Sequence, residues 1–241
     1  MIGPILLAVT WLLLRLEGRG LAAIGVDHGA RRFAEFAVGF ALLALAAAVQ
    51  QLGLSAATGD PFILNAHARP AALLDGARFV VNSVLYEELL FRGYLLHQAV
   101  RWLGPRRAVW LDAAAFGVYH WFSYNAFGNP VVMAYLFVLT GAYGLMWARA
   151  FVATGSVAAP IGLHLGWNVV TYLVFSAGPL GAALLVPASG THRLQSSGWS
   201  AVVLSVIWPF LVTAAVLALC RRYERRAGAD HLQPVTAPRA A

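Results

Sequence analysis

Long apolar segments alternate with short polar interruptions along the chain, and this pattern predicts a bundle of membrane-spanning helices. Most of the apolar segments approach the roughly 20 residues that a helix needs to cross a hydrocarbon core of about 30 Å. Each interruption contains Gly, Pro or charged residues, which are typical of helix ends. The apolar segments span residues 2–16, 33–54, 73–100, 108–126, 130–149, 156–177 and 200–220. The predicted fold class is therefore all-α, a polytopic transmembrane bundle of about seven spans.

Composition and charge placement add an orientation to this bundle. The chain of 241 residues is 60% hydrophobic and only 11% charged, whereas about a quarter of an ordinary globular protein is charged. All 17 of its basic residues are arginines, and they are not gathered into the single basic face that nucleic-acid binding requires. With the N-terminus outside, thirteen arginines fall on the cytoplasmic side and only Arg69 and Arg193 on the outer side. The positive-inside rule then predicts N-out, C-in, and nucleic acid is not expected as a partner.

We expect one domain and a tail. Residues 1–222 form a single transmembrane domain, and residues 73–177 hold the polar motifs described below. Residues 223–241 are polar and have no apolar period, so we expect a disordered cytoplasmic tail.

The segment "VLYEELLFRGYLL", residues 84–96, places three charges inside an otherwise apolar span. Each charged side chain at mid-membrane costs at least about 2.5–3.5 kcal/mol on insertion scales. Glu88 and Arg92 stand four residues apart, so they can form an ion pair on one helix face. Glu87 is then left without a partner, and an unpaired carboxyl within a membrane is a candidate functional group.

Polar side chains on two other spans can meet Glu87. His120 lies in the fourth segment, and the sixth segment carries His164 and Asn168 on one helix face, since they are four residues apart. With a rise of about 1.5 Å per residue, these groups and Glu87 lie about 12–20 Å from the predicted cytoplasmic ends of their spans. We therefore expect the four side chains to converge on one cavity.

Structural explanations compete with this hypothesis. A membrane histidine can simply form a hydrogen bond with a neighbouring helix, and His164 with Asn168 can hold two helices together. The Glu88–Arg92 pair favours a structural role over a catalytic one.

The motifs resemble a known family. "EELLFR" fits E-E-x-x-x-R, "FGVYH" at 116–120 fits F-x-x-x-H, and "HLGWN" fits H-x-x-x-N, each on its own apolar segment. Their order and spacing over residues 73–177 are similar to those of the CPBP intramembrane proteases, which include type II CAAX prenyl proteases and bacteriocin-processing Abi-like proteins. Each motif is weak alone, and the three in order are more specific.

The resemblance implies hydrolysis of a peptide bond inside the membrane. Glu87 would activate water with His120, His164 and Asn168 would bind the substrate carbonyl or its oxyanion, and Glu88 with Arg92 would support them. In a second scheme Glu87, His120 and His164 would bind one Zn²⁺ or another divalent metal, with Glu88 as the spare carboxyl. The absence of H-E-x-x-H favours the metal-free scheme slightly.

The resemblance implies a peptide or protein substrate that is membrane-associated or lipidated, and the composition favours a multi-pass protein of the bacterial inner membrane surrounded by lipid. A proton-coupled transporter and a non-catalytic membrane partner are the alternative functions, because intramembrane Glu and His also serve proton pathways. The oligomeric state is not predicted.

Overall fold

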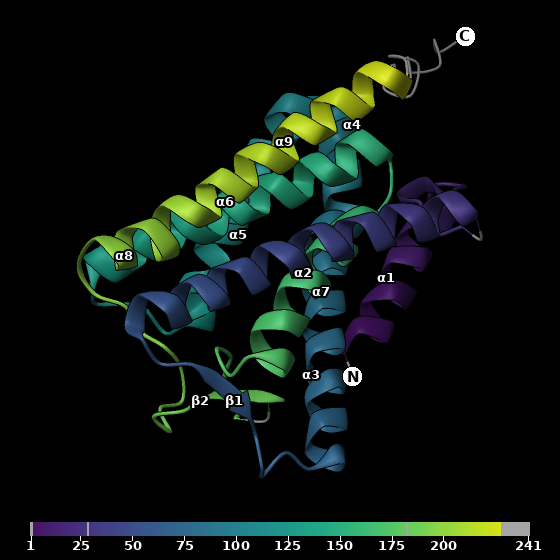
Figure 1. Cartoon of the computed structure of the whole chain (residues 1–241). Helices are drawn as coiled ribbons and strands as arrows, with labels where there is room; N and C mark the ends of the chain where they lie inside the picture. The colour runs from purple at the N-terminus through teal and green to yellow at the C-terminus, as the bar shows by residue number, and fades with distance from the viewer. Residues whose placement is uncertain (1, 28, 182, 228–241) are drawn as a thin grey trace, which may run out of the picture.

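The apolar segments are helical in the computed structural model, which describes residues 2–27, 29–181 and 183–227 (Figure 1). The α-helices are α1 (Ile2–Leu16), α2 (Ala30–Thr58), α3 (Pro70–Leu89), α4 (Leu96–Leu103), α5 (Pro105–Ser123), α6 (Pro130–Thr154), α7 (Ala158–Val169), α8 (Gly198–Val202) and α9 (Trp208–Ala227). The remaining elements in these ranges are the 3₁₀ helix η1 (Leu21–Ile24), the π-helical segments η2 (Leu90–Leu95), η3 (Val170–Val174) and η4 (Val203–Ile207), and the strands β1 (Phe62–Leu64) and β2 (Leu185–Pro187).

The predicted all-α class is confirmed, and each of the seven apolar segments contains helix. Three helical stretches in the described residues are long and apolar enough to cross a membrane: Ala30–Thr58, Pro130–Thr154 and Gly198–Arg226. The count of seven spans and the N-out orientation stay predictions. Helix α9 continues to Ala227, so the first residues of the expected tail are helical, and residues 228–241 lie outside the described residues.

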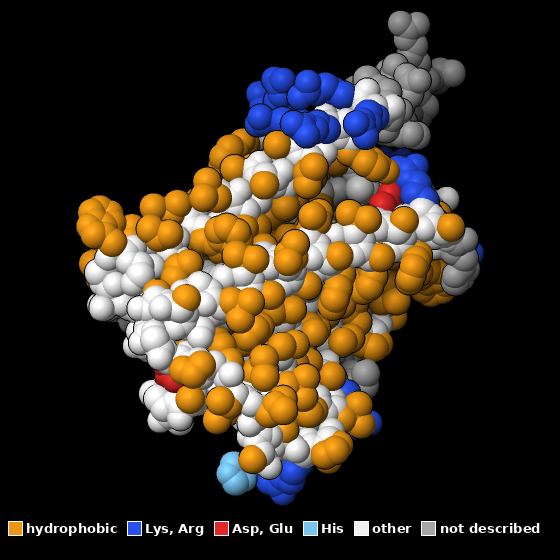
Figure 2. All heavy atoms as spheres, in the orientation of Figure 1, with side chains coloured by type: hydrophobic (Ala, Val, Ile, Leu, Met, Phe, Trp, Pro, Cys, Tyr) orange, Lys and Arg blue, Asp and Glu red, His pale blue; other side chains and the backbone are white. Residues whose placement is uncertain are grey.

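The outer surface has the character expected of a membrane protein. Figure 2 shows hydrophobic side chains over much of the visible face, with arginines gathered at the end of α9. Large apolar side chains are exposed along α2 and along the α8–α9 stretch, among them Phe33, Leu45, Trp199 and Leu211. Exposed apolar area on this scale marks contact with lipid or protein, and with the long apolar helices it identifies an integral membrane protein.

Two glycines allow α7 to pack directly against the backbone of α2. A Cβ atom on Gly162 would lie 2.2 Å from the Phe36 carbonyl oxygen, and one on Gly166 would lie 2.2 Å from the Phe40 oxygen. Small residues four apart are a common device for close helix contact in membranes. Because residues two apart in a helix point in nearly opposite directions, this contact turns His164 away from α2.

A short antiparallel pair of strands from distant parts of the sequence joins two loops at the other end of the bundle. Strand β1 pairs with β2 in the register Phe62–Pro187 and Leu64–Leu185, and Figure 1 shows the pair beside the start of α3. The loops that contain β1 and β2 also contain Arg69 and Arg193, the two arginines predicted to lie on the outer side. Their pairing is consistent with the two loops lying on the same side, and which side that is stays a prediction. The pairing itself was not predicted.

Candidate active site

Helix α3 carries the two glutamates and then changes its winding. Glu87 and Glu88 occupy its last turns, and the π-helical segment η2 follows directly. Within η2 Gly93 has non-helical dihedral angles (φ −75°, ψ −122°), so the chain kinks just after the charged residues. π-Helical turns of this kind occur frequently at functional sites.

His164 lies between the two glutamates. Its Nδ1 atom is 2.8 Å from Glu88 Oε1, and its Nε2 atom is 4.0 Å from Glu87 Oε2. The Glu88 side chain is completely buried, whereas Glu87 keeps 12% of its side-chain surface exposed. The structure therefore joins the E-E-x-x-x-R and H-x-x-x-N motifs through a direct contact between α3 and α7.

Arg92 balances the buried acidic groups. Its side chain is completely buried, with Nη1 3.5 Å from Glu88 Oε1 and Nε 3.1 Å from Asp112 Oδ2 on α5. Neither Nε nor Oδ2 has a well-oriented hydrogen-bond partner among the described residues, so the Asp112 contact is mainly ionic. Nη2 donates to the Gly144 carbonyl at 3.1 Å, which α6 can present closely because Gly144 has no side chain.

His120 is fixed by its own helix. Its Nδ1 atom is 2.8 Å from the Phe116 carbonyl oxygen one turn earlier on α5. A carbonyl oxygen can only accept, so Nδ1 carries the proton and, in the neutral ring, Nε2 keeps a free lone pair. The ring stacks with Tyr124, their centroids 5.9 Å apart.

An aromatic path joins His120 to His164. The ring of Phe116 lies 4.4 Å from His120 and 5.3 Å from Trp147, measured between centroids. Trp147, on α6, stacks on His164 at 4.0 Å with an interplanar angle of 15°. A continuous series of ring contacts therefore links the two histidines, although no hydrogen bond or ion pair among the described residues joins them directly.

Asn168 occupies the next turn of α7 after His164. It is buried, with 8% of its surface exposed, and no described hydrogen bond links its amide to Glu87, His120 or His164. Of the six residues singled out from the sequence, the structure thus directly connects Glu87, Glu88, Arg92 and His164. It places His120 beside them through aromatic rings, and Asn168 one turn along the same helix.

The predicted metal ligands do not form a suitable set in this arrangement. Among the described residues, no group of three or more His, Cys, Asp and Glu side chains is placed to hold a metal ion. His164 Nδ1 is occupied by Glu88, and Nε2 lies 4.0 Å from the Glu87 carboxylate. Zinc–nitrogen and zinc–oxygen bonds are about 2.0–2.2 Å long, so a tetrahedral centre needs these two ligand atoms closer together. We therefore derive no reaction step through a metal.

Sequence reasoning missed two side chains of this site. Asp112 supplies the second carboxylate around Arg92, and Trp147 supplies the surface on which His164 stacks. A signal for Asp112 was present, because Asp112, Phe116 and His120 repeat every four residues and lie on one helix face. Trp147 offers no comparable signal, since an aromatic residue in a membrane span is ordinary.

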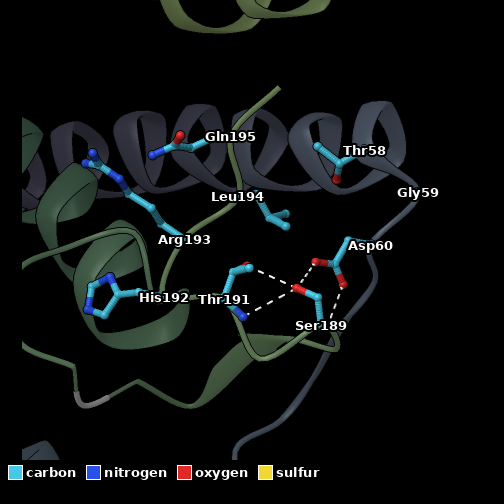
Figure 3. A pocket seen from close by; sticks show the side chains of 9 residues that line it. All are labelled: Thr58, Gly59, Asp60, Ser189, Thr191, His192, Arg193, Leu194 and Gln195. Atoms are coloured by element: carbon cyan, nitrogen blue, oxygen red, sulfur yellow. Dashed lines mark hydrogen bonds between the residues drawn. The ribbon is translucent and has the colours of Figure 1, made fainter. Parts of the chain in front are cut away.

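Two cavities formed by the described residues lie elsewhere. One, of about 790 Å³, is formed at the loop end by residues including Asp60, Ser189, Thr191 and Arg193 (Figure 3). Ser189 Oγ there donates to Asp60 Oδ2 at 2.5 Å. The other, of about 490 Å³, opens between α2 and α9. Neither is lined by Glu87, His120 or Asn168.

The three motifs are thus assembled around a buried carboxylate–histidine–arginine network on α3, η2, α5 and α7. Residues 69–170 match the family model of Rce1-like type II CAAX prenyl endopeptidases. This match confirms the family resemblance predicted from the motifs, and it covers α3 through α7 together with the start of η3. No curated protein and no solved structure matches the chain. The Rce1-like match supports an intramembrane endopeptidase that acts on a peptide or protein substrate.

Proposed function

We propose that the protein is an intramembrane endopeptidase that hydrolyses a peptide bond of a membrane-associated or lipidated protein, in the manner of CAAX processing. The observation that carries this proposal is the position of Glu87. Its carboxylate faces His164 across 4.0 Å, and the other side of that imidazole is held by the fully buried Glu88. A partly exposed carboxylate next to a fixed histidine is suited to activating water.

Glu87 is the general base in this proposal, and His120 assists it. With Nδ1 donating to Phe116, Nε2 of His120 can accept a hydrogen bond from the attacking water. Glu87 takes the water proton as the water oxygen bonds to the carbonyl carbon. The same proton then passes to the departing amide nitrogen, so that the carbon–nitrogen bond breaks and an amine and a carboxylic acid are released, and the acid then loses its proton to water.

His164 and Asn168 stabilise the oxyanion. Glu88 holds Nδ1 of His164, so Nε2 is the ring nitrogen that faces the Glu87 side of the site. An N–H at that position and the Asn168 amide, one turn along α7, can both donate to a tetrahedral oxygen. Removing one such donor costs about 2.7–4 kcal/mol of transition-state stabilisation in other acyl-transfer enzymes.

Glu88, Arg92 and Asp112 hold the histidine rather than touching substrate. Glu88 fixes the ring orientation of His164, and Arg92 offsets the charge of Glu88. Asp112 in turn fixes Arg92. A buried network of this kind acts as a unit, so each member affects the position of His164.

The test measures cleavage by the full chain, purified in detergent, of a farnesylated CAAX peptide, the same peptide without its lipid, and an unmodified membrane-segment peptide. Glu87→Gln should lower the cleavage rate by about 10²–10⁴-fold, the range expected for loss of a general base. Glu224→Gln is the matched control, because Glu224 of α9 pairs with Arg149 and, among the described residues, not with any residue of the Glu87–His164 site, and it should cleave like the wild type.

Cleavage that survives Glu87→Gln would contradict the assignment of the base. Failure of the wild-type protein to cleave any of the three peptides, combined with Glu87-dependent proton flux in liposomes, would overturn the protease proposal. The ratio of the rates on the lipidated and lipid-free peptides decides whether the substrate must carry a prenyl group.

A further inference from the structure

An apolar groove separates α2 from α9 at the arginine-rich end of the bundle. It encloses about 490 Å³, and residues of α6 and α7 form its floor. Small side chains hollow it out, namely Ala34, Gly39, Ala150, Ala153 and Ala159. Helices α2 and α9 lie outside the residues 69–170 of the family match, so this groove is formed largely by parts of the chain that the match does not cover.

The side of the groove opens towards the lipid-facing surface. Val38 and Leu219 line it from the two opposing helices and are 60% and 43% exposed. Deeper in, Leu163 and Val216 belong to the buried core. The lining of the groove is therefore apolar from the lipid-facing surface to the buried core, and such a lining suits a hydrocarbon chain.

The end of the groove is basic. Arg31, Arg222 and Arg226 all line it, and Glu35 is the one acidic residue that does so. Glu35 is already engaged, because Arg31 Nε lies 2.9 Å from its Oε1 and Arg32 Nη1 lies 2.9 Å from its Oε2. Among the described residues no acidic partner contacts the side chains of Arg222 and Arg226. The end of the groove therefore carries an excess of positive charge.

A polar contact ties the two helices at this end. Tyr223 of α9 donates from its hydroxyl to Glu35 Oε1 of α2 at 3.2 Å, and the Arg31 guanidinium lies 5.9 Å from the centre of the Tyr223 ring. This contact fixes the spacing of α2 and α9 where the arginines lie, while the apolar part remains open. Figure 2 shows arginine side chains gathered over this end of α9, directly beside the apolar face.

We propose that this groove binds an anionic phospholipid, with one acyl chain against Leu163 and Val216 and the phosphate at Arg222 and Arg226. Both parts of such a lipid match the groove: its hydrocarbon chain fits the apolar walls, and its phosphodiester neutralises the arginines. Basic pockets between transmembrane helices are known to bind anionic head groups. The proposal depends on membrane insertion and is independent of the protease proposal.

The test counts lipids retained by the purified full chain with native mass spectrometry, after incubation with dioleoyl phosphatidylglycerol or dioleoyl phosphatidylcholine. The wild type should prefer the anionic lipid by about tenfold, since the choline cation of phosphatidylcholine offsets its phosphate and is repelled by the arginines, whereas phosphatidylglycerol keeps a net negative charge. Arg222→Gln with Arg226→Gln should abolish the preference. The matched control, Arg221→Gln with Arg225→Gln, removes the same charge from the same helix at positions that do not line the groove, and it should retain the preference.

Two further experiments test the acyl-chain part of the groove separately from the arginines. Ala153→Phe fills the apolar part and should reduce retention of both lipids. Inorganic phosphate should not displace the bound phosphatidylglycerol, because the acyl chain also holds the lipid in the groove. Equal loss of preference in the two arginine pairs would overturn the proposal in favour of general attraction to a basic surface. Unchanged lipid retention with a changed oligomeric state in Ala153→Phe would show that a second copy of the chain occupies the groove.

Discussion

Glutamate and arginine meet in two very different regions of this molecule. In the site, Glu88 and Arg92 are both completely buried, and their contact distance is 3.5 Å. At the arginine-rich end, Arg149 and Glu224 form a shorter contact of 2.6 Å with about a fifth to a quarter of each side chain exposed. We expect the shorter contact to be the weaker contributor to stability, because a pair that is still partly in contact with water loses less when its charges separate.

The buried network is different because its charges have no alternative partner. Two carboxylates, Glu88 and Asp112, surround one guanidinium, and each group has been removed from water at a cost of several kcal/mol. The hydrogen bonds to His164 and Gly144 offset part of that cost. Such a network is maintained for the geometry it imposes, and here that geometry is the orientation of His164.

The largest effect should follow from Arg92→Met. The substitution leaves two buried carboxylates without their cation, and removing one partner of a buried ion pair costs about 3–5 kcal/mol. Unfolding of the full chain in detergent, followed by circular dichroism, measures the change in unfolding free energy. Arg149→Met is the matched control and should cost about 0–1 kcal/mol. Equal effects of the two substitutions would remove the distinction between the two regions.

Asp112→Asn should have an intermediate effect. It removes one negative charge but leaves an oxygen that can still face Arg92, and the loss of a hydrogen bond or contact to a charged group typically costs about 1–3 kcal/mol. The same substitution at Asp75, whose pair with Arg78 is largely exposed, should cost no more than about 1 kcal/mol.

Activity sharpens the Asp112 prediction. If Asp112 positions Arg92 and, through Glu88, His164, then Asp112→Asn should lower kcat while KM changes little, and Asp112→Glu should restore part of the rate. An Asp112→Asn enzyme with full kcat would show that Arg92 is held adequately without it.

The smallest effect should appear at the arginine-rich end as a dependence on pH. The pKa of Glu17 lies below its usual value of 4.5 because the Tyr94 hydroxyl donates to its carboxylate and Arg101 lies 2.7 Å away. A lowered pKa in the folded state stabilises the protein at pH above 4.5, and this contribution is lost as the pH falls through the folded-state value. Glu17→Gln should therefore flatten the fall in Tm between about pH 5 and about pH 3. An unchanged pH profile would mean that Glu17 retains an ordinary pKa.

The sequence was sufficient to predict the helices and the membrane setting because both depend on local patterns. The apolar segment expected at 2–16 coincides with α1, and the one at 130–149 lies within α6. The segment expected at 73–100 is divided in the structure into α3, η2 and α4. A π-helical turn changes the hydrogen-bond register without a marked change in hydropathy, so the pattern of apolar residues does not reveal it.

The site was predictable at the level of residues and not at the level of contacts. The cost of charge in a membrane identifies Glu87, Glu88 and Arg92 directly from their place in an apolar run. Their partners depend on how α3, α5 and α7 pack, so the sequence suggested Arg92 as the main partner of Glu88, whereas His164 is much closer. The Asp112 contact depends on the same packing: its four-residue spacing from Phe116 places it on the face of α5 that carries His120 but does not identify Arg92 as its partner.

The π-helical turn at Leu90–Leu95 has a mechanical consequence. In a regular helix, the direction in which α4 presents its side chains would be fixed by the direction in which α3 presents Glu87 and Glu88. The wider turn changes the direction of the α4 side chains relative to those of α3, because one residue more or less in a helix rotates everything beyond it by about 100°. The glutamates can therefore face α7 while Leu96, just beyond the turn, faces the separate core around Leu14 and Val109. Deleting a single residue from this turn would rotate α4 by about 100° relative to α3. Leu96 and the two glutamates could then no longer both face their present neighbours.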